Sequence, residues 1–171
     1  NGIKLVISDN PVSGKEILAL IDKGKPSSNS LGNVKEINIK DSYIKEVVDS
    51  SKINNNIKVV IDCGNGAAGF IAPELYKKLG CEVIELYSEV DGNFPNHHPD
   101  PGKIDNLKDL INEVRKQKAD LGLAFDGDGD RVGLVTDKGD IVFPDKIMMM
   151  LCKDILSMKK GSVIFDVKCS D

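Results

Sequence analysis

Short apolar runs alternate with amphipathic segments through the middle of the chain. Residues 59–61, 82–87 and 121–125 are brief, largely apolar runs, which is typical of buried strands. Residues 71–79 and 104–117 repeat their apolar positions at helical spacing instead. Such alternation favours parallel strands with helices covering both faces of the sheet. We therefore expect an α/β fold, a three-layer α/β/α arrangement with a mixed, mainly parallel sheet.

The pattern changes after the third of these strands. Residues 132–136 and 140–143 flank an Asp-Lys-Gly turn at 137–139, which predicts an antiparallel hairpin. Residues 144–158 have apolar positions at helical spacing, and 162–168 reads as a buried strand. Because the chain stops on this strand, we expect it to end within a further folding unit.

The N-terminal part predicts a strand, a helix and a loop. Residues 3–7 read as a strand, and the Ser-Gly-Lys-Glu run at 13–16 is a capping box that opens a helix. This helix should end near Gly24, where a loop rich in helix breakers begins and continues to residue 33. The buried side of the helix is expected to carry Ile17, Leu18, Leu20 and Ile21.

The segment after this loop joins the N-terminal part to the repeated strands and helices. We expect a short strand at 34–39, then a helix that Asp41 caps and that Asn54-Asn55-Asn56 ends. Its apolar positions are Tyr43, Ile44, Val47 and Val48. We place the first domain boundary just beyond the loop, after residue 38.

The most informative segment is the run Asp-Gly-Asp-Gly-Asp-Arg at residues 126–131. Like charges placed this close together cost electrostatic energy unless a cation or a basic group neutralises them. Alternate residues of a straight strand lie about 6.6 Å apart, whereas oxygens that share one Mg²⁺ each lie about 2.1 Å from it. The loop must therefore curl, and Gly127 and Gly129 give its backbone that freedom. The pattern predicts one Mg²⁺ site formed by Asp126, Asp128 and Asp130.

Arg131 follows these carboxylates directly and offers a forked donor suited to a phosphate that bridges the ion. A solvated acidic turn is the structural alternative. A calcium EF-hand loop shares aspartates at its first, third and fifth positions, but Arg131 stands where that loop needs Gly and Asp137 stands where it needs Glu. The strand-like flanks also disagree with an EF-hand. A metal-binding module without enzymatic activity stays open.

A glycine-rich run at residues 64–69 supports a rival function. Gly64, Gly66 and Gly69 follow a predicted strand and open a helix, and Glu85 comes at about the distance expected of a ribose-binding acid. These features fit a dinucleotide-binding oxidoreductase domain. The structural alternative is a tight strand-to-helix turn in which the glycines allow close packing and bind no ligand.

Two adjacent histidines, His97 and His98, lie in a loop at 91–101 that contains three prolines. Adjacent histidines rarely bind the same ion, and no cysteine or third histidine lies at a ligand spacing. A role in ordering the loop is therefore favoured over a metal site.

Charge and cysteine content narrow the classes of partner. The chain has 171 residues, 40% of them hydrophobic and 29% charged, and a net charge of −4 with lysines spread along its length. This composition is typical of soluble globular proteins, with no basic patch for nucleic acid and no apolar run long enough for a membrane span. The cysteines are scattered singly, which favours reduced, buried thiols and a cytoplasmic location; they are Cys63, Cys81, Cys152 and Cys169.

Four stretches together resemble one enzyme family, the α-D-phosphohexomutases. Residues 125–133, Phe-Asp-Gly-Asp-Gly-Asp-Arg-Val-Gly, resemble the metal-binding loop of that family. Residues 60–66, 91–101 and 165–169 agree with it in order and spacing, so the resemblance covers nearly the whole chain. Jointly they are similar to the bacterial phosphomannomutase/phosphoglucomutase branch.

The resemblance implies an enzyme of four domains that interconverts hexose 1-phosphate and 6-phosphate. A phosphoserine would pass its phosphate to the sugar, and a bisphosphorylated sugar would return a phosphate to the serine. Arg131 would contact the transferring phosphate. Lys4 matches a lysine shortly after the family's serine loop, and Lys168 matches a lysine that faces the cleft from the third domain. Without the resemblance, both would be read as solvated lysines on strands. Mg²⁺ would be held by Asp126, Asp128 and Asp130.

The resemblance also implies parts that this sequence lacks. The Ser-His-Asn-Pro nucleophile loop and the Gly-Glu-Met-Ser-Gly-His sugar-recognition loop do not occur in it. We therefore expect the chain to need the remaining mutase domains as partners and to be inactive by itself. The implied division is 1–38 as the end of a first domain, 39–140 as a complete second domain, and 141–171 as the start of a third.

Overall fold

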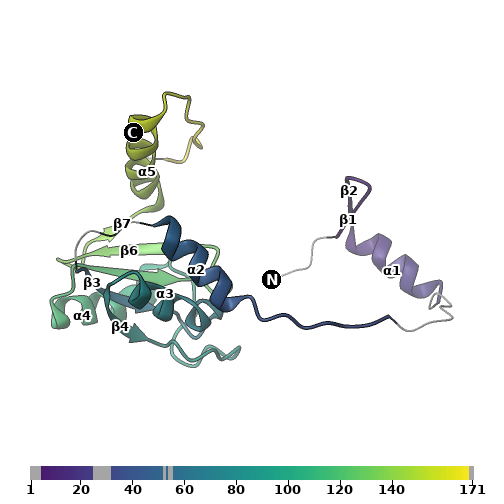
Figure 1. Cartoon of the computed structure of the whole chain (residues 1–171), viewed down its shortest axis with the longest axis horizontal. Coiled ribbons are helices and arrows are strands. Elements are labelled where there is room, and N and C mark those ends of the chain that lie inside the picture. The colour runs from purple at the N-terminus through teal and green to yellow at the C-terminus, as the bar shows by residue number, and fades with distance from the viewer. Residues whose placement is uncertain (1–4, 25–31, 52, 54–55, 170–171) are drawn as a thin grey trace. The chain divides into compact units, whose positions relative to one another are not determined.

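The computed structural model describes residues 5–24, 32–51, 53 and 56–169. Contacts along the chain divide it into two compact units, Asn1–Asn38 and Ile39–Asp171 (Figure 1).

The first unit consists of a short hairpin and one helix. Strand β1 (Leu5–Ile7) pairs antiparallel with β2 (Asn10–Val12), and helix α1 (Gly14–Asp22) follows. The predicted capping box is confirmed, because the Ser13 side chain accepts from the Glu16 N–H and the Glu16 carboxylate accepts from the Ser13 N–H. The helix ends at Lys23, next to the predicted Gly24.

The prediction that α1 has a buried side is wrong for the described residues. The side chains of Leu18, Leu20 and Ile21 are 60%, 59% and 65% exposed. The hairpin of this unit is too small to cover a full helix face, so helical periodicity alone did not produce burial.

The segment before the second unit is also less regular than predicted. Residues 34–39 form no strand, and Val34 is 93% exposed, because no neighbouring strand among the described residues pairs with them. Helix α2 (Lys40–Ser50) begins after Ile39. Asp41 lies in its first turn and is not its cap, and the helix ends before the predicted asparagines.

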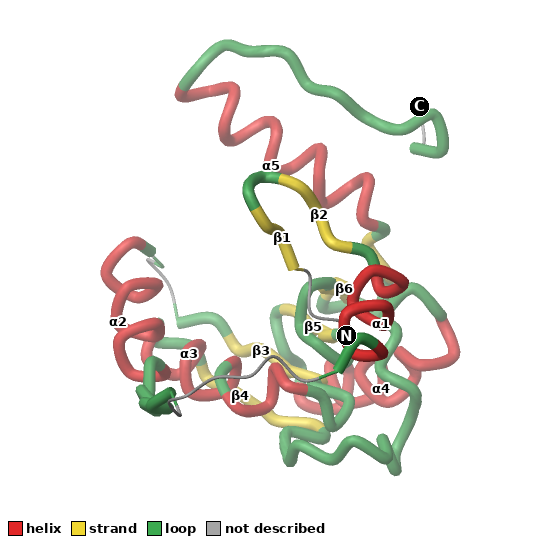
Figure 2. The backbone as a smooth tube through the Cα atoms, turned by 90° about the vertical axis from the view of Figure 1, so that its right-hand side faces the viewer, coloured by secondary structure: helices red, strands yellow, loops and turns green. Residues whose placement is uncertain are grey.

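A five-stranded sheet forms the centre of the second unit, in the order β4-β3-β5-β6-β7. Figure 2 labels β3, β4, β5 and β6 among its yellow strands. β4, β3 and β5 are parallel, and β6 and β7 add to the β5 edge in antiparallel fashion. This mixed sheet and its helices confirm the predicted three-layer α/β/α fold. The strands are β3 (Lys58–Asp62), β4 (Glu82–Leu86), β5 (Leu121–Phe125), β6 (Val132–Thr136) and β7 (Ile141–Val142).

Helices lie on both faces of this sheet. Successive side chains of β3 alternate between these two faces, and each face is covered by a different helix. Val60 packs with Leu110 and Val114 of helix α4 (Lys108–Gln117), whereas Val59 and Ile61 pack on the other face with residues of helix α3 (Ala72–Lys78). Successive side chains of a strand point to opposite faces, so one short strand contributes to both cores. Figure 1 shows the two helices packed around the sheet.

A 3₁₀ turn comes directly before α4 and just before α3. Helix η1 (Ala67–Phe70) precedes α3, and helix η2 (Ile104–Leu107) precedes α4. The C-terminal limits agree with the prediction, since Gly80 has a left-handed φ of 89° and Lys118 a φ of 50°. Such residues end helices because their backbone turns away from the helix axis.

The last part of the chain contains helix α5 (Pro144–Met158), as predicted, but no strand at 162–168. Ile164 and Val167 are 96% and 97% exposed. An apolar run becomes a strand only where another strand accepts its hydrogen bonds, and no described strand lies beside this one. In the described ranges, no helix has the length and apolar character needed to cross a membrane.

All four cysteines are free thiols, but only Cys63 is buried. Burial raises the pKa of the Cys63 thiol to about 11, despite a hydrogen bond with Ser88. It therefore stays protonated and behaves as a small apolar side chain of the core.

The glycine-rich turn after β3 is packed against other backbone. A Cβ atom added at Gly69 would lie 2.1 Å from the carbonyl oxygen of Ser88, and one at Gly66 would lie 2.9 Å from the carbonyl oxygen of Gly127. Real Cβ atoms do not approach backbone this closely, so these positions require glycine because of the space that they leave for other loops.

We predict that Gly69→Ala lowers the free energy of unfolding by about 2 kcal/mol or more, because the added methyl group overlaps the Ser88 backbone. Denaturant unfolding followed by circular dichroism measures this change. Gly92→Ala is the matched control, since its Cβ would meet nothing within 4 Å, and should change stability by less than about 0.5 kcal/mol. Equal losses in the two variants would contradict the packing explanation.

Candidate metal centre

The acidic loop begins where β5 ends. Asp126 follows the last strand residue and is only 2% exposed, whereas Asp128 and Asp130 are exposed. One carboxylate oxygen from each of the three lies within 4.8 Å of the others. The structure thus brings together the three side chains that the sequence singled out, and their binding of a metal remains a prediction.

Backbone hydrogen bonds curl this loop. The Gly129 N–H donates to the Asp126 carbonyl oxygen at 3.1 Å, and the Asp126 N–H donates to the Arg131 carbonyl oxygen at 3.3 Å. Gly129 has a left-handed φ of 73°, which fits its expected role. Gly127 does not need that conformation. A Cβ atom added at Gly127 would lie 3.4 Å from the Pro99 ring and 3.6 Å from Phe94, which are ordinary van der Waals distances, so the expected need for glycine is met only at Gly129.

Arg131 donates hydrogen bonds to Asp126, the buried carboxylate of the acidic loop. Its backbone N–H donates to Asp126 Oδ1 and its Nε donates to Asp126 Oδ2, both at 2.9 Å. Its Nη1 donates to Asp100 Oδ1 at 3.0 Å. The Arg131 side chain is still 59% exposed, so the guanidinium can reach a ligand in solvent.

The pKa values of Asp126 and Asp130 are shifted in opposite directions. Burial raises the pKa of Asp126, but hydrogen bonds from the Arg131 backbone and side chain outweigh it and leave that pKa below its ordinary value. Asp130 has a raised pKa, because its hydrogen bond with Asp126 and the charges of Asp128 and Asp126 favour its protonated form. A bound cation would relieve this repulsion. An all-carboxylate donor set suits a hard divalent ion such as Mg²⁺ or Ca²⁺.

Hydrogen bonds with neighbouring segments support the acidic loop. The Ala67 N–H donates to the Gly127 carbonyl oxygen at 3.0 Å, so the turn after β3 touches the turn after β5. Asn65 is 5% exposed and donates through Nδ2 to the Glu89 carbonyl oxygen, while its Oδ1 accepts from Asn96. These contacts join three chain segments around the acidic loop.

His97 forms a buried contact that the sequence did not reveal. Its Nε2 lies 2.9 Å from Oδ2 of Asp62, which is fully buried at the end of β3. Burial raises the pKa of Asp62, while His97 and the Gly64 N–H oppose that rise. The contact orders the loop at 91–101, which is the kind of role favoured for His97. The one available signal was an aspartate inside an apolar strand run.

Of the two candidate lysines, the structure describes only Lys168. Lys4 lies outside the described residues. Lys168 is exposed, and its Nζ lies 3.7 Å from Asp166 Oδ2. It lines a hollow with the start of α5, at Phe143 to Lys146, and not with the acidic loop. The catalytic roles of both lysines remain predictions.

The glycines of the turn after β3 are packed against other parts of the protein. Added Cβ atoms at Gly64, Gly66 and Gly69 would each come within 3 Å of protein atoms, at 2.9, 2.9 and 2.1 Å. Glu85 forms an ion pair with Lys77 at 2.6 Å. Close packing, the structural alternative for this turn, is what the structure shows.

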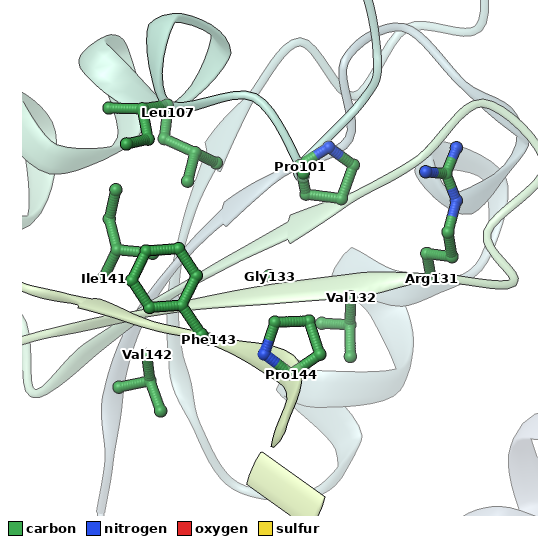
Figure 3. A pocket seen from close by; sticks show the side chains of 11 residues that line it. Pro101, Leu107, Arg131, Val132, Gly133, Ile141, Val142, Phe143 and Pro144 are labelled. Carbon is green, nitrogen blue, oxygen red and sulfur yellow. The ribbon is translucent and has the colours of Figure 1, made fainter. Parts of the chain in front are cut away.

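An apolar cavity of about 510 Å³ lies beside the acidic loop. Figure 3 shows Leu107, Ile141 and Phe143 on one side of its lining and Arg131 at the other side. The three aspartates are not part of the lining. The Arg131 side chain therefore lies at the edge of an apolar cavity, and this cavity supplies no further ligand for a cation.

Comparison with known proteins identifies the family of this chain. The family model described as phosphoglucomutase/phosphomannomutase, alpha/beta/alpha domain II, matches residues 41–139. A phosphomannomutase/phosphoglucomutase of Pseudomonas putida is 53% identical over 173 aligned residues, which cover 99% of this chain and 37% of that protein. A phosphoglucomutase of Neisseria gonorrhoeae is 46% identical over 98% of this chain and 38% of its own length.

A solved structure shows the same likeness. The crystal structure of a phosphoglucomutase/phosphomannomutase family protein from Burkholderia thailandensis superimposes with a TM-score of 0.78 and 40% sequence identity, over 88% of this chain and 33% of that one. The chain thus spans a little over a third of the length of the curated relatives that it matches. From the family match and these relatives, we conclude that the chain belongs to the phosphoglucomutase/phosphomannomutase family.

Proposed function

We propose that this chain belongs to a cytoplasmic, Mg²⁺-dependent phosphohexomutase that interconverts hexose 1-phosphate and hexose 6-phosphate. The reaction would pass through a phosphoserine and a bisphosphorylated sugar. The observation that carries the proposal is the convergence of Asp126, Asp128 and Asp130 within 4.8 Å, with Arg131 fastened beside them. The named activities of the relatives support the substrate class.

In this proposal the three aspartates have different tasks. Asp126 is buried and held by two hydrogen bonds from Arg131, so it fixes the inner side of the cation site. Asp128 and Asp130 are exposed and complete the site from the solvent side. When bound, Mg²⁺ would offset the negative charge that builds up on a transferring phosphoryl group.

Arg131 is proposed to contact that phosphoryl group. Its Nε and Nη1 are engaged with Asp126 and Asp100, whereas its Nη2 makes no hydrogen bond within the described part of the chain. A guanidinium held at two nitrogens presents its remaining donor in a fixed direction, and such fixed donors stabilise charge in a transition state.

The rest of the active site would come from other parts of the protein. We propose that residues 1–38, 39–140 and 141–171 belong to three successive mutase domains, and that Lys4 and Lys168 face the substrate from the first and the third. The sequence contains no Ser-His-Asn-Pro run, so the nucleophilic serine would lie elsewhere in the full-length protein. These 171 residues alone should not turn over a hexose phosphate.

We predict that Asp128→Asn weakens Mg²⁺ binding at least about tenfold, because it replaces a charged ligand with a neutral one. Titration calorimetry with MgCl₂ measures the affinity. Asp137→Asn is the control, since this exposed aspartate lies in the turn between β6 and β7, and it should bind Mg²⁺ normally. Binding of NADH by a protein that does not respond to Mg²⁺ would favour the dinucleotide alternative and contradict the proposal.

In the full-length protein, Asp126→Asn should lower kcat/KM for conversion of hexose 1-phosphate at least about a hundredfold, because the substitution removes both a cation ligand and the ion pair to Arg131. A coupled assay that detects hexose 6-phosphate measures the rate. Asp137→Asn should retain the unaltered rate. Unchanged turnover in Asp126→Asn would refute the assignment of the acidic loop, while Mg²⁺ binding without any turnover in the unaltered protein would leave only a metal-binding module.

A further inference from the structure

Arg131 is held from two sides by carboxylates that lie far apart in the sequence. Asp126, in its own loop, accepts from Nε at 2.9 Å. Asp100, from the loop at 91–101, accepts from Nη1 at 3.0 Å. The second contact joins residues 31 positions apart, so a separate loop helps to hold the guanidinium in place.

Asp100 is itself held firmly by its own turn. Its Oδ1 also accepts from the Gly102 N–H at 3.1 Å, and its carbonyl oxygen accepts from Asn106 Nδ2 at 2.9 Å. Its backbone N–H donates to the His98 carbonyl oxygen at 2.8 Å. The side chain is only 21% exposed. Asp100 is therefore a charged acceptor whose position does not depend on Arg131.

Other carboxylates compete for the same guanidinium. Nε of Arg131 lies 3.9 Å from Asp130 Oδ1, beyond hydrogen-bonding distance, and the Asp130 side chain is 73% exposed. Arginine pairs strongly with carboxylates through two parallel hydrogen bonds. If Nη1 lost its partner and the guanidinium paired with Asp130 instead, it would occupy an oxygen that a cation needs.

We propose that Asp100 is a positioning residue that keeps Arg131 off the exposed carboxylates, so that these remain open to a divalent cation. The inference rests on the proposed function, because it concerns the same cation site. It assigns to the loop at 91–101 an effect on metal affinity, although no residue of that loop is a proposed ligand. Asp100 acts only through Arg131, and this property makes the inference testable.

A double-mutant cycle measures that dependence. The full-length protein is titrated with Mg²⁺ by calorimetry as the unaltered form, as Asp100→Ser, as Arg131→Met and as the double variant. Serine can still accept from the Gly102 N–H, but its side chain is too short to reach Arg131. We expect Asp100→Ser to raise the Kd for Mg²⁺ about tenfold when Arg131 is present, and by less than about twofold in the Arg131→Met background.

Two further variants control for charge and for folding. Asp105→Ser removes an aspartate that is 85% exposed and paired with Lys108, away from the acidic loop, and it should leave the Kd unchanged. Asp100→Asn keeps an oxygen for both Gly102 and Arg131 but loses the charge, so its Kd should lie between those of the unaltered protein and Asp100→Ser. If Asp100→Ser does not fold, Asp100→Asn replaces it in the cycle, with a smaller rise of about threefold that Arg131→Met should again abolish.

The outcomes separate this inference from the proposed function. An equal loss of affinity in both backgrounds would show that Asp100 acts by its charge alone, and no loss in either would show that it does not act on the site. Both results overturn the inference and leave the Mg²⁺ site intact. Failure of the unaltered protein to bind Mg²⁺ would overturn the proposed function together with the inference.

Discussion

The candidate site depends on the parallel pairing of β3 with β5. In this register Asp62 lies opposite Ala124, so the two strands end side by side, and the turns that follow them leave the same edge of the sheet. The carboxyl ends of parallel strands are where α/β folds place their ligands. Here the hydrogen bond from the Ala67 N–H to the Gly127 carbonyl oxygen joins the two turns. Without that register, the aspartates would still follow β5, but the turn after β3 would not lie against their loop.

The loop at 91–101 adds the contacts that give the acidic loop its shape. Phe94 and Pro99 lie against Gly127, His97 contacts the buried Asp62, and Asp100 contacts Arg131. These contacts come from one segment and reach both of the turns at the edge of the sheet. The acidic loop is therefore one part of a small assembly of three segments, in which glycines allow the backbones to approach closely.

The sequence predicted the elements that carry strong local patterns and missed the contacts that depend on distant residues. Strands 121–125 and 132–136 were predicted with the bounds that the structure gives, because apolar runs beside turn residues are local signals. The strand predictions at 34–39 and 162–168 were wrong, since a strand also needs a neighbouring strand. Convergence of the three aspartates followed from spacing and glycine content. The Asp100–Arg131 and Asp62–His97 contacts could not be predicted, because they join residues more than 30 positions apart with no periodic pattern.

The central claim is that the three aspartates bind one divalent cation beside Arg131. A crystal structure of the full-length protein grown with Mn²⁺, which reports its own position by anomalous scattering, tests this claim most directly. The account predicts a single strong anomalous peak in direct contact with one oxygen each from Asp126, Asp128 and Asp130, while Arg131 keeps its hydrogen bonds to Asp126 and Asp100. A structure with no peak there, and with the Arg131 guanidinium lying among the three carboxylates, would contradict it.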